Sequence, residues 1–202
     1  METKLNYKRT FLIGLAFLSI CSFWQMYDNI IPLILQNTYH LGETMTGAVM
    51  ALDNVLAIFL LPVFGMLSDK VHTKLGRRMP FIVAGTILAV IFMMLLPMID
   101  NAEKARWSTG ESFSNQVIFL AVLFFTLVSM GLYRSPAVAL MPDVTPNHLR
   151  SRANAVINLM GAVGGVYALI MIKVLVGKGE TPDYLPLFAS IAAVMAIAVG
   201  IL

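Results

Sequence analysis

Long apolar runs separated by short polar segments are the feature that most constrains this chain. Two of them flank the sequence GMLSDKVHTKLGRRMPF, residues 65–81. The run before it, residues 46–67, is apolar except for Asp53 and Asn54, and the run after it, residues 80–99, holds no charge at all. Each run has about the 20 residues that a helix needs to cross a bilayer. Because the segment between them carries four Lys/Arg against one Asp, it is predicted to be a cytoplasmic turn between two membrane helices.

Composition agrees with a membrane protein. Hydrophobic residues make up 58% of the chain and charged residues 12%, with a mean hydropathy of +0.81, whereas a soluble domain has about 25% charged residues. The single cysteine, Cys21, excludes a disulfide within the chain. The net charge of +3 does not indicate nucleic-acid binding, because the basic residues gather in a few polar segments.

Six apolar runs are predicted to form the membrane-spanning helices of an all-α fold. Nine Lys/Arg fall in residues 4–9, 70–78 and 150–152. The positive-inside rule places these segments and the N-terminus in the cytoplasm, and residues 36–45 and 100–115 outside the membrane. The implied environment is a lipid bilayer, most simply the plasma membrane. The runs cover residues 10–35, 46–67, 80–99, 116–141, 153–176 and 184–202.

The order of residues in the first basic loop says more than its charge. Gly65 would let a neighbouring helix approach closely, and Asp69 is expected just past a helix end, facing backbone N–H groups or a helix N-terminus. Gly76 permits a sharp turn, and Pro80 suits the first turn of the next helix.

This loop resembles the signature loop between helices 2 and 3 of the major facilitator superfamily. Its longer spacing is similar to the glycoside–pentoside–hexuronide and sucrose-type branch, whose loop reads S-D-x-x-x-[ST]-[KR]-x-G-R-R-x-P-[FW]. The resemblance implies a cytoplasmic gate. The residues of this loop that would form it are Gly65, Asp69, Lys70, Gly76, Arg77 and Arg78.

A second segment strengthens the resemblance. Residues 134–155 read RSPAVALMPDVTPNHLRSRANA, similar to the pattern P-x-x-A-L-x-x-D-[LV]-[ST]-x-x-x-R-x-x-A-N of sucrose-type and related sugar symporters. Asp143 and Arg150 hold the Asp and first Arg of that pattern and join the expected gate. Plant sucrose transporters carry an Arg two residues after the first Pro, where this chain has Val138. Thr145 is also expected to cap a helix beginning at Pro146.

The resemblance implies that residues 1–202 form one domain, the N-terminal six-helix half of a twelve-helix transporter. Such halves contain three-plus-three inverted repeats around one wall of a midplane site. The sixth run reaches Leu202 with no polar exit, so we expect the chain to stop at or within helix 6, with a C-terminal six-helix half as its partner.

The function implied is secondary active transport of a sugar or glycoside in symport with a coupling ion, H+ or Na+, and with no other cofactor. Two alternatives stay open. One is efflux of a drug-like or other small metabolite, and the other is a non-transporting receptor or assembly subunit with the same fold.

Two carboxylates lie within the apolar runs, where charge is costly and needs a reason. Asp28 and Asp53 each fall about seven residues from the outer end of their runs, which is about 10 Å at 1.5 Å per residue. Two carboxylates at one depth on neighbouring helices could share a proton or hold a cation. Both are predicted ion-coupling residues, and Asp28 is the stronger candidate because Trp24 and Tyr27 fall on its helix face.

An aromatic ring beside a carboxylate suits a sugar, since the ring stacks on C–H groups and the carboxylate accepts from hydroxyls. Arg134, within the fourth run, is expected about 10 Å from Asp28 and Asp53 along the membrane normal, too far for a direct ion pair. It would instead face a central cavity, bind an anionic or hydroxylated substrate, or pair with a group of the C-terminal half. The bland alternatives are an interfacial aromatic belt, a snorkelling Arg and simple helix packing. The predicted substrate-binding residues are Trp24, Gln25, Tyr27, Asp28, Asn54, Arg134 and Asn158.

Nothing in the sequence favours an enzyme. The three histidines, His40, His72 and His148, fall in predicted loops, and the apolar runs contain no Ser-His or metal-ligand spacing. No Gly-rich phosphate loop followed by Lys-Ser/Thr occurs, so ATP is not the expected energy source.

Overall fold

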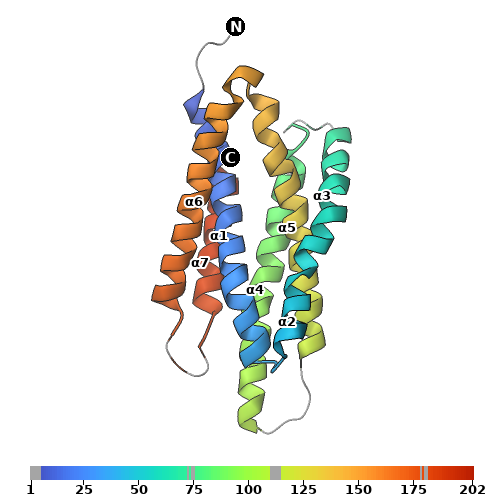
Figure 1. Cartoon of the computed structure of the whole chain (residues 1–202), viewed down its shortest axis with the longest axis vertical. Coiled ribbons are helices and arrows are strands. Elements are labelled where there is room, and N and C mark those ends of the chain that lie inside the picture. The colour runs from blue at the N-terminus through green and yellow to red at the C-terminus, as the bar shows by residue number, and fades with distance from the viewer. Residues whose placement is uncertain (1–5, 72, 74–75, 110–114, 178, 180–181) are drawn as a thin grey trace.

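The computed structural model describes residues 6–71, 73, 76–109, 115–177, 179 and 182–202, and side chains are described for these except residues 108 and 109. Within this part the chain is helical, with no strand (Figure 1). The elements are α1 (Tyr7–Asn37), α2 (Glu43–Met50), α3 (Leu52–Lys70), α4 (Met79–Thr109), α5 (Gln116–Val144), a 3-10 turn η1 (Asn147–Leu149), α6 (Arg150–Leu175) and α7 (Leu185–Ile201).

In the described part of the chain, five helical segments are long and apolar enough to cross a membrane, with α2 and α3 counted together. The shorter apolar helix α7 covers the sixth predicted run with 17 residues. The N-terminal end of α1, the turn from α3 to α4 and the turn from α5 to α6 lie at one end of the bundle (Figure 1). We call this the basic end, because it carries the Lys/Arg-rich loops.

The second predicted span, residues 46–67, is not one continuous helix. It begins as α2, is interrupted at Ala51 and continues as α3 to Lys70. The interruption places Asp53 in the first turn of a new helix, where a carboxylate is stabilised by the partial positive charge of the helix N-terminus. An apolar run does not reveal such a break.

The predicted outer loop, residues 100–115, is also partly wrong, because α4 continues through residue 109. Asp100, in this extension, is fully buried. It accepts hydrogen bonds from Thr38 Oγ1 and Lys104 Nζ, both at 2.6 Å. The helix can therefore carry charges past the apolar run, because they neutralise one another against α1.

Two close helix crossings set the packing. A Cβ at Gly164 of α6 would collide with the carbonyl oxygen of Leu18 of α1, and Ser22 Oγ donates to the Gly164 carbonyl oxygen at 2.9 Å. A Cβ at Gly85 of α4 would likewise meet the backbone of Tyr133 of α5. Glycine allows these backbones to approach more closely than any other residue would.

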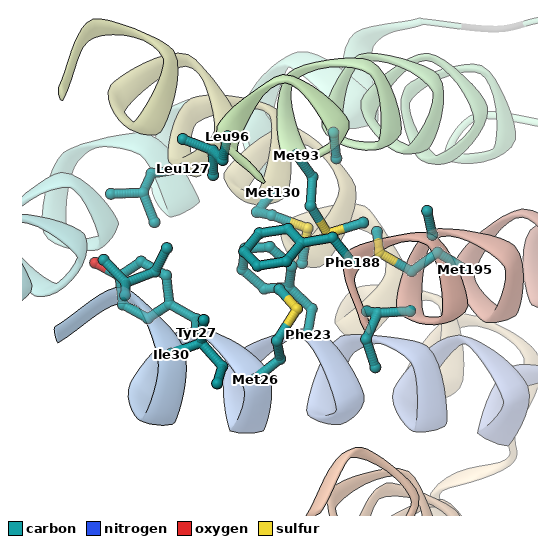
Figure 2. Packing of buried hydrophobic residues seen from close by; sticks show 14 of the residues in the cluster. Phe23, Met26, Tyr27, Ile30, Met93, Leu96, Leu127, Met130, Phe188 and Met195 are labelled. Atoms are coloured by element: carbon teal, nitrogen blue, oxygen red, sulfur yellow. The ribbon is translucent and has the colours of Figure 1, made fainter. Parts of the chain in front are cut away.

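The core lies between α1, α4, α5 and α7. Figure 2 shows Phe23 and Met26 of α1 close to Met93 of α4, Met130 of α5 and Phe188 of α7. By contrast, α3 packs on the rest of the bundle mainly through α5, and α2 packs on α1. Ser68 is the one fully buried residue between Leu52 and Lys70. Most of the surface of α3 is therefore left uncovered.

Candidate functional site

Trp24 and Arg134 form the centre of the candidate site. Arg134 Cζ lies 5.5 Å from the centroid of the Trp24 ring, within the distance of a cation–π interaction. Trp24 is fixed in turn by edge-on contacts with Phe23 at 5.3 Å and Tyr27 at 5.4 Å. The predicted aromatic cluster therefore exists, and one of its rings contacts a guanidinium.

A small pocket brings this pair together with Asp53. It lies between α1, α3 and α5, has a volume of about 20 Å³, and is walled by apolar side chains of α3 and α5 such as Leu60 and Leu127. That volume is enough for about one water molecule and too small for a sugar in this conformation. Trp24, Asp53 and Arg134 are its polar groups.

Arg134 also lines a second pocket. Further along α5 toward the basic end, a pocket of about 200 Å³ is lined by Leu61, Arg134, Ser135 and Val138. Leu61 and Arg134 line both pockets. Arg134 and Leu61 therefore lie where the narrow and the wider pocket adjoin.

The two intramembrane carboxylates lie in different surroundings. Asp53 is half-buried, lines the narrow pocket and accepts a hydrogen bond from Asn54 Nδ2 at 3.0 Å. Asp28 is exposed and does not line that pocket. The two carboxylates are near enough to repel each other, and both interact electrostatically with Tyr27. Tyr27 is 1% exposed, and its hydroxyl has no hydrogen-bond partner among the described residues.

The other predicted substrate-binding residues do not line the two pockets around Arg134. Gln25 is half-buried near Gly165 of α6, Asn54 is exposed beside Asp53, and Asn158 is exposed on α6. The sequence did not single out Tyr133, whose hydroxyl lies 2.7 Å from Ser19 Oγ and thereby joins α5 to α1. Its position next to Arg134 was the only available signal.

Arg78 organises a second candidate site at the basic end. Its Nη2 lies 2.9 Å from Asp69 Oδ1, its Nε donates to Asp143 Oδ2, and its Nη1 donates to Ser68 Oγ at 3.2 Å. The side chain of Arg78 is only 9% exposed. One buried guanidinium therefore joins the ends of α3 and α5 to the beginning of α4.

The expectation for Asp69 needs one correction. Asp69 lies in the last turn of α3 rather than past its end, and its partner is Arg78 of the same loop. The buried guanidinium is a stronger partner for a carboxylate than a helix N-terminus. Ser68, which also bonds Arg78, was missed by the sequence reasoning although it adjoins Asp69.

The remaining loop residues have local roles. Gly76 has a φ of +100°, as a sharp turn requires, and Gly65 passes close to Ser135, whose Oγ donates to the Leu61 carbonyl oxygen. Arg150 donates to the carbonyl oxygens of Pro142 and Thr145 and so caps the end of α5. Lys70 and Arg77 are exposed.

Thr145 does not cap the next helix as expected. It ends α5, and a 3-10 turn at Asn147–Leu149 precedes α6 without a side-chain cap. Pro146, with an extended backbone, stands between Thr145 and this turn, so Thr145 is not at the N-cap position.

A polar network at the opposite end of the bundle was not predicted. Lys104 Nζ bonds Asp100 and the Pro182 carbonyl oxygen at 2.7 Å and lies 4.6 Å from the centre of the Tyr184 ring. It ties α4 to the segment before α7. Burial, with the nearby Asp100 and Glu103 carboxylates, raises the pKa of the Tyr39 phenol, so Tyr39 stays neutral over the physiological range.

Helices able to span a membrane, with a guanidinium and a carboxylate in a pocket between them, are the features of a polytopic membrane protein with charged groups among its helices. The sequence pattern of the Major Facilitator Superfamily matches residues 3–202. The chain belongs to this family, which confirms the resemblance and makes it an integral membrane protein of a transporter family rather than an enzyme family.

Curated relatives at low identity are sucrose transport proteins. The chain is 26% identical over 137 residues to sucrose transport protein SUT3 of Oryza sativa subsp. japonica, which covers 64% of this chain and 27% of that protein. It is 35% identical over 116 residues to sucrose transport protein SUC4 of Arabidopsis thaliana, covering 54% and 22%. The matches therefore span about a quarter of the relatives' length.

Proposed function

We propose that this chain forms one half of a secondary active transporter that moves a sugar or glycoside in symport with a cation. The observation that carries the proposal is the pocket shared by Trp24, Asp53 and Arg134. Charged groups inside membrane helices are costly and usually mark a substrate or ion path. The sucrose transport relatives supply the substrate class.

The arrangement of the helices supports a six-helix half with an inverted repeat. In this proposal the spans in order are α1, α2 with α3, α4, α5, α6 and α7. An inverted repeat makes α1 equivalent to α5, α2 with α3 equivalent to α6, and α4 equivalent to α7. The contact of α1 with α6 then has an equivalent in the contact of α5 with α3. Likewise, the contact of α4 with α5 has an equivalent in the contact of α7 with α1. All four contacts occur. This is the symmetry expected of such repeats.

A second six-helix half would complete the site. In the most apolar stretch of the segment Glu43–Lys70, no residue is buried. In the most apolar stretch of Asn147–Leu175, only 22% of the residues are buried. These faces remain available to a partner half on the same or another chain. The basic end is cytoplasmic in this proposal, as the positive-inside rule requires, and the membrane is the plasma membrane.

Arg78 would act as a gate at that end. It holds α3, α4 and α5 together through Asp69 and Asp143, and opening the cytoplasmic side would require these contacts to rearrange. For ion coupling, the structure favours Asp53 over Asp28 because only Asp53 lines the pocket with Arg134. The coupling ion is H+ or Na+.

Uptake by the purified whole protein in liposomes tests this function. A panel of neutral and acidic sugars and glycosides is offered with an inward proton gradient or an inward sodium gradient. The proposal expects saturable accumulation of at least one of them, abolished by the ionophore that dissipates the driving gradient. Uptake of none of them, or accumulation driven only by ATP, would contradict it.

A further inference from the structure

A groove on the outside of the bundle follows the seam between α4 and α7. Its volume of about 320 Å³ is within the range of small-molecule sites. The buried residues Thr86 and Val199 form its floor. Its exposed walls are made by apolar residues of α4 and small residues of α7, namely Val83, Ile87, Ile91, Ala196 and Gly200. The groove is therefore a shaped hollow on a face that the rest of the described chain leaves open.

The chemistry of this groove suits a hydrocarbon chain. Its one polar side chain is that of Thr86, whose Oγ1 donates to the Ile82 carbonyl oxygen at 2.8 Å. A sugar bound here would bury hydroxyl groups without partners, which is costly, whereas a hydrocarbon chain has none to bury. The groove runs from Val83 to Ile91, about 12 Å of helix. That length fits within the roughly 15 Å of hydrocarbon in one leaflet of a bilayer.

A second hollow, of about 180 Å³, lies one helical turn further toward the basic end. Met79 of α4 and Leu202 of α7 line it. They lie four residues from Val83 and three residues from Val199 of the groove. Arg9 of α1 is the charged residue of this hollow, and its guanidinium has no hydrogen-bond or ion-pair partner among the described residues. A permanent positive charge therefore lies beyond one end of an apolar groove.

The charges at the basic end select an anionic headgroup. Lys8 and Arg9 are exposed at the start of α1. The described carboxylates of this end, Asp69 and Asp143, both bind Arg78. A zwitterionic headgroup brings a cation together with its phosphate, and the carboxylates that could bind this cation are already paired. An anionic headgroup brings the phosphate charge alone, which a guanidinium binds through two N–H donors and a neighbouring basic residue attracts further.

We infer that the seam of α4 and α7 binds one anionic phospholipid, with an acyl chain in the groove and the phosphate at Arg9. The bilayer supplies this occupant, since the chain belongs to a family of membrane transporters. The site is separate from the pocket that holds Asp53. It depends neither on the transported substrate nor on which side of the membrane the basic end faces. The bound lipid would bridge α1, α4 and α7 and so hold α7 to the bundle.

Photolabelling of the whole protein in detergent tests the inference. The probe is a phosphatidylglycerol with a diazirine on one acyl chain, and mass spectrometry of the digested protein maps the labels. They should concentrate on peptides that contain residues 83–91 and 196–200. Unlabelled phosphatidylglycerol should compete about fivefold better than phosphatidylcholine, the effect of one basic residue beside an anionic lipid. Glycerol 3-phosphate, the soluble source of the same phosphate chemistry, should not compete, because burial of the chain supplies most of the affinity.

Matched variants separate the chain from the headgroup. A Cβ added at Gly200 meets open space, so Gly200→Phe should fill the groove without a clash. Labelling should then fall about tenfold, as exclusion of about two CH2 groups allows, whereas Ile197→Phe, exposed on α7 outside the groove lining, is the control. Arg9→Gln should bring the two competing lipids within about twofold of each other, and Arg152→Gln, exposed on α6, should not. Thermal melting checks that each variant is folded.

The inference is overturned if labels spread evenly over the lipid-facing helices or are absent from the seam of α4 and α7. It is also overturned if phosphatidylcholine or glycerol 3-phosphate competes as well as phosphatidylglycerol does. Labelling of a folded Gly200→Phe variant at the wild-type level would exclude the groove, and an unchanged lipid preference in Arg9→Gln would exclude the headgroup site. None of these readouts uses sugar uptake, so a failure here leaves the proposed function standing, and a failure of uptake leaves this site standing.

Discussion

Arg78 Nε donates to Asp143 Oδ2, although 65 residues separate the two in the chain. The contact joins the beginning of α4 to the end of α5, and Asp69 binds the same guanidinium from α3. Three helix ends thus depend on one buried cation. This arrangement makes the effect of each carboxylate testable.

Replacing Asp69 by Asn should reduce transport much more than it reduces protein abundance. The change keeps the side-chain shape and removes one charge from Arg78, but the Asp69 side chain is 54% exposed, so the loss of folding stability should be at most about 1 kcal/mol. Initial uptake rates and membrane levels measure the two effects.

The exposed Glu43→Gln, in the first turn of α2 and away from Arg78, controls for loss of a carboxylate. Uptake by Asp69→Asn equal to that of wild type would mean that the ion pair has no part in gating.

Replacing Gly164 by Ala should destabilise the crossing of α1 and α6. The added Cβ would collide with the Leu18 carbonyl oxygen, which is rigid backbone, and overpacking of this kind typically costs about 1–3 kcal/mol. Gly165→Ala is a matched control, since its nearest neighbour would be Gln25 Oε1 at 3.7 Å.

Thermal melting in detergent should show a lower midpoint for Gly164→Ala and little change for Gly165→Ala. Equal midpoints for the two variants would refute the close crossing.

Topology can be tested with single cysteines after Cys21, the native one, has been replaced by Ala. Thr73→Cys lies in the loop at the basic end and Ala102→Cys lies in the exposed face of the α4 extension at the opposite end. An impermeant maleimide applied to intact cells should label position 102 and spare position 73, and permeabilised cells should be labelled at both. Labelling of position 73 alone in intact cells would reverse the orientation.

The sequence was most informative where local chemistry determines the structure. Gly76 and Pro80 were predicted to form a turn and a helix start, and Gly76 indeed has a positive φ. The helix break at Ala51 was not predictable, because apolar residues continue through it. Likewise, the pairing of Asp100 with Thr38 and Lys104 depends on α1 lying against α4, which no local pattern encodes.

The central pocket was predictable only in its residue types. Trp24, Asp53 and Arg134 stood out because they are aromatic or charged within apolar runs. Periodicity placed Trp24 and Asp28 on one helix face, whereas the structure leaves Asp28 exposed and places Asp53 in the pocket with Trp24. The choice between two carboxylates at one depth depends on the rotation of α1 and α3, which is set by tertiary packing.

Ion coupling through Asp53 is the central claim, and Asp53→Asn in the reconstituted whole protein tests it most directly. Asn imitates the protonated carboxyl group and cannot release a proton. Accumulation driven by the ion gradient should therefore be lost, while exchange of labelled for unlabelled substrate across the same membranes persists. Asp28→Asn is measured beside it as the rival. An Asp53→Asn protein that still accumulates substrate against a gradient would contradict the account, and loss of accumulation in Asp28→Asn alone would assign the coupling to Asp28.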